Sequence, residues 1–164
     1  MKKTVVVSLS LLLVLVATRI AVSHCEIPCG IYDDPARITL IREHLGTVEK
    51  SMKQIEAIGA AEKPNWNQLA RWVANKEKHA DEIQHLVTQY FMTQRVKVPA
   101  AGAAKAREVY LAQLTALHEL LVAAMKMKQT TDAGQVAAGR ACVDRFVTAY
   151  FGPEDRKALL GGTK

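Results

Sequence analysis

The stretch ITLIREHLGTVEKSMKQI, residues 38–55, decides the fold because its apolar residues recur every three or four positions. This spacing places one set of side chains on one helix face, namely Ile38, Ile41, Leu45, Val48, Met52 and Ile55. The charged residues Arg42, Glu49, Lys50 and Lys53 stay outside this apolar face. A helix that is apolar on one face must bury that face against a partner, so we expect further amphipathic helices.

Three further segments repeat this spacing. A second expected helix runs to about Gln94, with Lys76 as its one polar intrusion among Leu69, Val73, Ala80, Ile83, Val87 and Tyr90. A third begins at about Ala103 and carries Tyr110, Leu114, Leu117, Leu121 and Met125. A fourth begins at Asp132, a good N-cap, and carries Val136, Val143, Val147 and Tyr150.

The segments between these helices are short and contain helix-breaking residues. Gly59 with residues 62–65, residues 95–102, and the Gly-Pro pair at residues 152–153 mark the breaks. No segment alternates apolar and polar residues for long enough to form a strand. The expected fold is therefore all-α: an antiparallel four-helix bundle over residues 35–152, followed by a C-terminal tail, residues 153–164.

The N-terminus has the three parts of a secretory signal peptide. Lys2 and Lys3 form a positive region, residues 5–16 are apolar apart from two serines, and Ala-Val-Ser at 21–23 offers small residues before a cut. A membrane anchor is the alternative, but the apolar stretch is shorter than the roughly 18–20 residues of a spanning helix. We expect signal peptidase to remove residues 1–23 and the protein to be exported, to a periplasm or the cell exterior, without stable membrane association.

Cleavage after residue 23 leaves 141 residues, enough for one domain with a single core. The removed segment carries Lys2, Lys3 and Arg19 and no acidic residue, so the formal net charge falls from +6 to +3. Without an arginine-rich or aromatic-interleaved stripe, this charge does not indicate a nucleic-acid partner. It is mildly favourable for attracting a small anion.

Most polar candidates within the helices fit a structural role. Glu82 and His85 have the Glu-x-x-His spacing of a di-iron site, but such a site needs a second copy, which the sequence lacks. His44, His79 and His118 are spaced as ordinary helix-surface residues. The Cys-x-x-Cys-His motif of haem attachment is absent.

Residues 24–33, His-Cys-Glu-Ile-Pro-Cys-Gly-Ile-Tyr-Asp, lie between the expected cut and the first helix, where helix packing explains neither cysteine. The third cysteine, Cys142, lies among small apolar residues and is expected in the core. The proline and glycine of the segment favour a tight turn that brings the sulfur atoms of Cys25 and Cys29 together. On spacing alone, a disulfide is the simpler interpretation, since exported proteins permit one.

The expected cut changes this balance because it makes His24 the first residue. Its amine and imidazole then become ligands, and the amide nitrogen of Cys25 joins amine and thiolate in two fused five-membered chelate rings. A plane of nitrogen and sulfur donors, completed by Cys29, suits nickel(II) or copper(II), whereas zinc favours a tetrahedron. These three residues are therefore the candidate metal ligands.

Residues 24–33 closely resemble the nickel hook of nickel superoxide dismutases, His-Cys-x-x-Pro-Cys-Gly-x-Tyr-Asp at the mature N-terminus. The resemblance implies one nickel ion per subunit, held by His24, Cys25 and Cys29. It also implies that Tyr32 stands beside the open face of the metal, and that helical bundles assemble as a homohexamer. We refer to residues 24–34 as the hook.

Two positions depart from the family pattern. Glu26 replaces the more familiar aspartate, which counts little if that position contributes its backbone. The carboxylate that orients the histidine in some members would fall near Thr39, so support for His24 must come from elsewhere or be missing.

The resemblance implies that superoxide is disproportionated to oxygen and hydrogen peroxide through Ni(II)/Ni(III) cycling, with protons from Tyr32, a thiolate or bound water. Two other hypotheses stay open at this point. An exported metal-binding helical bundle would use the same hook without turnover, and a metal-free bundle would join Cys25 to Cys29 by a disulfide. Superoxide consumption by the nickel form tests the first, and non-reducing mass spectrometry tests the second.

Overall fold

The computed structural model describes residues 30–161, so residues 1–29 and 162–164 lie outside the described part of the chain. Its helices are α2 (Asp34–Gly59), α3 (Trp66–His85), the π-helix η1 (Leu86–Arg95), α4 (Ala104–Gln129), α5 (Ala133–Tyr150) and α6 (Pro153–Gly161). The described residues contain no strand, and the expected all-α fold is confirmed. Within residues 30–161, no helix combines the length and apolar character needed to cross a membrane.

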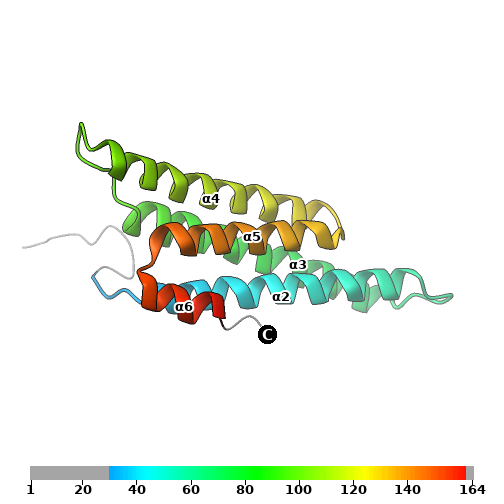
Figure 1. Cartoon of the computed structure of the whole chain (residues 1–164). Helices are drawn as coiled ribbons and strands as arrows, with labels where there is room; N and C mark the ends of the chain where they lie inside the picture. Colours follow the sequence, from blue (N-terminus) through cyan, green and yellow to red (C-terminus); the bar gives the residue numbers. More distant parts are fainter. Residues whose placement is uncertain (1–29, 162–164) are drawn as a thin grey trace, which may run out of the picture. The chain divides into compact units, whose positions relative to one another are not determined.

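The long helices alternate in direction. Figure 1 shows α2 and α4 running one way and α3 and α5 the other. Both α2 and α4 pack against α3 and α5, so α2 and α4 lie diagonally across a shared core. This unit begins at Asp33, whereas residues 30–32 belong to a separate N-terminal unit.

Side-chain caps begin three of the long helices. Asp33, Asn65 and Asp132 each accept a hydrogen bond from a backbone N–H two or three residues further on, at 2.8–3.1 Å. Each bond satisfies a first-turn N–H that has no partner within the helix. The predicted N-cap at Asp132 is confirmed.

The core is apolar and follows most of the predicted faces. Two predicted core residues are wrong: Val73 of α3 is 39% exposed, and Met125 of α4 is 42% exposed while Leu120 and Met127 are buried instead. Among the fully enclosed side chains of the core are Ile38, Ile41, Leu45, Val48, Met52, Ile83, Phe91, Leu117, Leu120, Met127 and Phe146. Gly139 on α5 permits a close approach of helices, because a Cβ there would lie 2.7 Å from Met127 Cε and 3.0 Å from Leu45 Cδ2. A side chain at this position would force the neighbouring core to shift.

The predicted end of the second helix, at about Gln94, is confirmed within one residue, but its last ten residues are wound as a π-helix. The α-helix ends at His85, and the chain continues as η1 with hydrogen bonds between residues five apart, for example Val96 N–H to Phe91 O at 2.8 Å. Buried residues in η1 recur at spacings that suit either winding. Apolar periodicity therefore predicts a buried helix here but does not distinguish π from α.

The expected C-terminal tail, residues 153–164, contains a helix instead. Pro153 occupies the first position of α6, where its missing N–H removes no helical hydrogen bond. Leu159 is buried against the bundle, and its carbonyl accepts a hydrogen bond from Arg42 Nη1. Arg42 also pairs with Asp144 of α5 at 2.7 Å, so one guanidinium ties α6 and α5 to α2.

Candidate metal centre

The three predicted nickel ligands, His24, Cys25 and Cys29, lie outside the described residues. Tyr32 is described, and 37% of its surface is exposed. Gly30 has a φ of +80°, in the left-handed region that favours glycine. The residue that follows the second cysteine is therefore well suited to the turn it makes.

The hook ends at Asp34, whose carboxylate binds side chains from two other helical elements. Arg95, at the end of η1, donates from Nε to Oδ1 at 2.8 Å and from Nη2 to Oδ2 at 2.8 Å, a bidentate ion pair. The hydroxyl groups of Tyr90 in η1 and Tyr150 in α5 each donate to this carboxylate at 2.7 Å. We name Asp34, Tyr90, Arg95 and Tyr150 the clamp.

The clamp holds an ionised carboxylate in a largely enclosed position, since the Asp34 side chain is 13% exposed. Burial by itself raises the pKa of Asp34, but the hydrogen bonds from Arg95, Tyr90 and Tyr150 outweigh it and hold the pKa below its usual value. Burial and the hydrogen bond to Asp34 raise the pKa of Tyr90 to about 12, and they raise that of Tyr150 as well. Both phenols therefore stay protonated at neutral pH and remain donors.

The π winding explains why Tyr90 and Arg95 reach the same carboxylate. Residues five apart in an α-helix are rotated by roughly 140° from each other about the axis. In a π-helix, residues five apart are hydrogen-bonded neighbours on successive turns. An α-helical continuation would therefore turn one of these two side chains away from Asp34.

Aromatic packing fixes the clamp phenols. Tyr150 stacks on Phe146, with ring centroids 5.0 Å apart and planes inclined by 20°. Phe91 meets both rings edge to face, at 4.9 Å from Phe146 and 5.9 Å from Tyr150. The guanidinium of Arg37 lies 5.2 Å from the centroid of the Tyr90 ring, a cation–π contact.

The described helices offer no competing metal site. Over residues 30–161, no three His, Cys, Asp or Glu side chains converge as a metal ion requires. Cys142 is buried, as expected, and its sulfur lies 3.2 Å from Arg145 Nη2. Thr39, at the position of the family carboxylate, donates its hydroxyl to Pro35 O of its own helix at 3.1 Å.

His44 and His79 differ from the sequence expectation. Their Nδ1 atoms lie 2.7 Å apart between α2 and α3, and both side chains are half-buried. They therefore form a contact between helices and are not ordinary surface residues. Periodicity places each on its own helix but does not align the two helices with each other.

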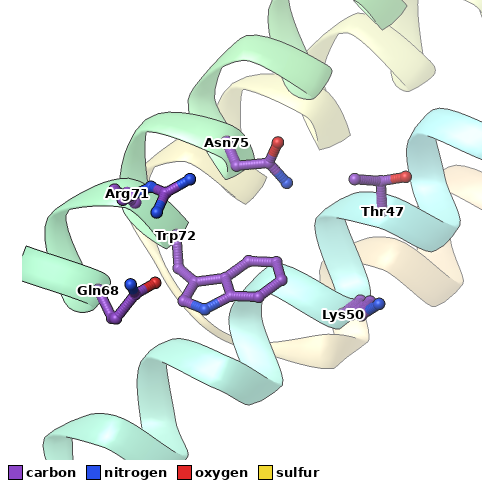
Figure 2. Close-up of a pocket in the computed structure, with 6 residues that line it drawn as sticks. All are labelled: Thr47, Lys50, Gln68, Arg71, Trp72 and Asn75. Atoms are coloured by element: carbon purple, nitrogen blue, oxygen red, sulfur yellow. The ribbon is translucent and has the colours of Figure 1, made fainter. Parts of the chain in front are cut away.

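A surface hollow of about 390 Å³ lies between α2 and α3, lined by Thr47, Lys50, Gln68, Arg71, Trp72 and Asn75. Figure 2 shows the Trp72 ring projecting from α3 toward α2. Asn75 Nδ2 donates to Ser51 Oγ at 2.9 Å, so part of its polar lining serves helix packing. At 1.5 Å rise per residue, Thr47 is roughly 20 Å along α2 from Asp34. The hollow is thus separate from the clamp.

Sequence reasoning missed the clamp. Spacing assigns Tyr90 and Tyr150 to the core, treats Arg95 as the start of a connection, and gives Asp34 no role of its own. One signal was present: two predicted apolar faces end in tyrosine, whose hydroxyl needs a hydrogen-bond partner when the ring is buried. The identity of that partner depends on packing between helices.

Comparison with known protein families finds one that fits both the motif and the fold. The family model of the nickel-containing superoxide dismutases matches residues 19–153, which include all of the hook and the four-helix bundle over residues 35–152. Comparison with curated proteins and with solved structures gives no match. A match over more than half of the chain, together with the all-α fold, shows that the chain belongs to the nickel-containing superoxide dismutase family.

Proposed function

We propose that this superoxide dismutase binds its nickel ion through His24, Cys25 and Cys29 at a mature N-terminus. Family membership establishes the activity, the nickel cofactor and superoxide as the substrate. The observation that carries the ligand assignment is the family match itself, because its residues 19–153 contain the whole motif. The absence of a competing cluster within residues 30–161 supports the same assignment.

The chemistry of these donors fits nickel. An amine and an imidazole from His24, an amidate and a thiolate from Cys25 and a thiolate from Cys29 provide nitrogen and sulfur donors for a tetragonal site. Thiolates and an amidate donate strongly and stabilise the higher of two oxidation states. When bound, nickel supplies the one-electron chemistry that converts superoxide to oxygen and hydrogen peroxide.

Tyr32 is the proposed catalytic residue beside the metal. Its side chain is partly exposed, which leaves it accessible to water and to a small anion. A phenolic O–H donates a hydrogen bond to superoxide or to an ordered water and helps to supply the protons that peroxide formation requires. In this role Tyr32 orders the substrate without binding the metal.

Export and cleavage complete the proposal. Residues 1–23 act as the signal peptide, and signal peptidase cuts between Ser23 and His24 on the way to a periplasm or the cell exterior. Before the cut, the nitrogen of His24 is an amide joined to Ser23, so the chelate lacks its amine donor. No side chain of this chain replaces that nitrogen at the same ring size.

The test compares three proteins that begin at Met1, at Ser23 and at His24. Each is loaded with nickel under reducing conditions, and superoxide turnover is measured per bound nickel ion. We expect turnover only from the form that begins at His24. Equal turnover from the form that begins at Ser23 would show that the amine is not a ligand and would refute the proposed hook.

We also propose that the subunits assemble into a homohexamer. Residues Val109, Leu111 and Met125 of α4 are 43%, 47% and 42% exposed, and an assembly would cover such apolar side chains. Light scattering of the mature nickel protein should give six times the subunit mass. A monomer at micromolar concentration would contradict this assembly.

A further inference from the structure

We infer that Asp34 is a positioning residue for the dismutase reaction and that it acts through Tyr32. The inference rests on the proposed hook. It follows from one juxtaposition. The carboxylate of Asp34 accepts four hydrogen bonds from side chains of η1 and α5, and Asp34 lies two residues after Tyr32, the proposed catalytic residue.

The chain between the two residues is short. Only Asp33 separates them, so their Cα atoms lie at most roughly 7 Å apart. Asp33 is itself held, because its side chain accepts a hydrogen bond from Ala36 N–H at 3.0 Å. The two residues that follow Tyr32 in the chain are therefore both held by contacts of the helical unit.

Asp34 makes more restraining contacts than the start of a helix requires. The Asp33 cap and Pro35 at the second position already favour a helix start here. The bidentate Arg95 contact fixes the direction of the carboxylate as well as its place, and the stacked Tyr150 ring holds one of its donors. This excess of restraint at the base of the hook points to a role in geometry beyond helix formation.

A second ion pair provides the matched control. Arg42 and Asp144 also tie α2 to α5, at 2.7 Å, but the Asp144 side chain is 49% exposed and its partner lies two helical turns beyond Asp34. Neutralising Asp144 removes an α2–α5 ion pair without touching the clamp. The comparison separates an effect on the hook from a general loosening of the bundle.

The experiment uses the mature protein, residues 24–164, with Asp34→Asn and Asp144→Asn variants. Nickel content and superoxide turnover per bound nickel are measured at a temperature where each variant is fully folded. We expect Asp34→Asn to keep its nickel, because all proposed ligands precede it. Its turnover should fall through misplacement of Tyr32, by at most the factor of about 2–10 expected when the Tyr32 hydroxyl itself is removed. Asp144→Asn should match the parent.

The coupling to Tyr32 is tested in a double-mutant cycle. In a Tyr32→Phe background, Asp34→Asn should lower turnover by a much smaller factor than in the parent, because the group that it positions is already gone. Equal factors in the two backgrounds, or full turnover of Asp34→Asn in the parent, would overturn the inference. A purely structural role would change the melting temperature and leave turnover per nickel unchanged.

Tyr150→Phe covers the case in which Asp34→Asn does not fold. It removes one hydrogen bond to Asp34 and keeps the ring that stacks on Phe146. We expect a severalfold fall in turnover per nickel that also vanishes in the Tyr32→Phe background, and an unchanged rate would overturn the inference. A parent protein without nickel-dependent turnover would instead overturn the hook assignment itself, and the inference with it.

Discussion

Asp34 and Lys76 are both charged side chains enclosed by the bundle, but they are satisfied in different ways. The Asp34 carboxylate accepts hydrogen bonds from side chains of η1 and α5, at the base of the hook. Lys76 Nζ donates to the carbonyl of Met127 at 2.8 Å and to that of Lys128, in the last turn of α4. It also pairs with Glu77 at 3.0 Å.

The contrast shows that one buried charge can stabilise the helical bundle while another can position a proposed functional site. Lys76 binds carbonyl groups that have no partner within their own helix, at the negative end of the helix dipole. Its role is complete within the bundle. Asp34 directly follows, in the chain, the segment that we propose to carry the chemistry. We therefore expect the loss of Asp34 to change turnover and the loss of Lys76 to change stability.

The largest effect is expected from Cys29→Ser, which removes a proposed ligand from the hook. The variant should lose both nickel and superoxide turnover, while its urea unfolding curve stays that of the metal-free parent. Cys142→Ser, in the core, should keep both nickel and turnover. Metal analysis and a superoxide assay check this, and parental turnover by Cys29→Ser would place the chemistry outside the hook.

Lys76→Ala should produce the largest loss of stability without a loss of chemistry. It leaves two helix-end carbonyl groups without their donor and opens a cavity, so the free energy of unfolding should fall by about 2–4 kcal/mol. Urea unfolding measures this loss, with the exposed Lys78→Ala as control. Turnover per bound nickel in the folded variant should equal that of the parent, and a tenfold fall would erase the contrast with Asp34.

Tyr32→Phe should keep nickel bound and lower turnover by a factor of about 2–10. This factor corresponds to the loss of one hydrogen bond that stabilises the transition state by about 0.5–1.5 kcal/mol. The substitution removes only the hydroxyl that we propose to lie beside the substrate, so inhibition by product or by small anions should also change. Nickel content and turnover are measured together. Complete loss of nickel would make Tyr32 a ligand or a structural element of the hook.

The smallest effect concerns His44 and His79. Burial, followed by the charge of His79, lowers the pKa of His44 below 6.5, against the opposing effect of Glu82. The unfolded chain then binds this proton more readily than the folded chain, so the unfolding free energy should fall as the pH drops through about 6.5. The stability that depends on neutral His44 is present above that pH.

Urea midpoints at pH 7.5 and pH 5.5 measure this dependence. His44→Gln should flatten the difference, whereas the exposed His118→Gln should leave it unchanged. A slope that survives in His44→Gln would assign the dependence to other groups. Turnover per nickel should be unchanged in His44→Gln, because the contact between His44 and His79 lies away from the clamp.

The helices were predictable because each buries one face, and a buried face requires apolar residues at regular spacing in the sequence. The burial of Ile38 to Met52, the cap at Asp132 and the buried position of Lys76 all follow the predicted spacing. The π winding of η1 and the short helix α6 were not predictable. The first shares its apolar pattern with an α-helix, and the second buries one large residue, Leu159, on a segment of nine residues.

The hook could be predicted because its proposed ligands are neighbours in the chain and a short chelate needs no distant partner. That assignment stays a prediction, since His24, Cys25 and Cys29 lie outside the described residues. No short-range pattern in the sequence predicts the clamp. Its four members come from three elements, between residues 34 and 150, and meet only when the helices take one relative register.

The amino-acid sequence by itself determined which segments become helices, and it predicts which residues bind nickel, because periodicity and chelation act over a few residues. The tertiary structure alone decided which buried polar groups meet. Asp34 accepts hydrogen bonds from Arg95 and two phenols, and Lys76 donates to carbonyl groups at the end of α4. His44 contacts His79 through the Nδ1 atoms. A buried polar group must be satisfied where packing places it, and packing depends on the contacts of the whole bundle.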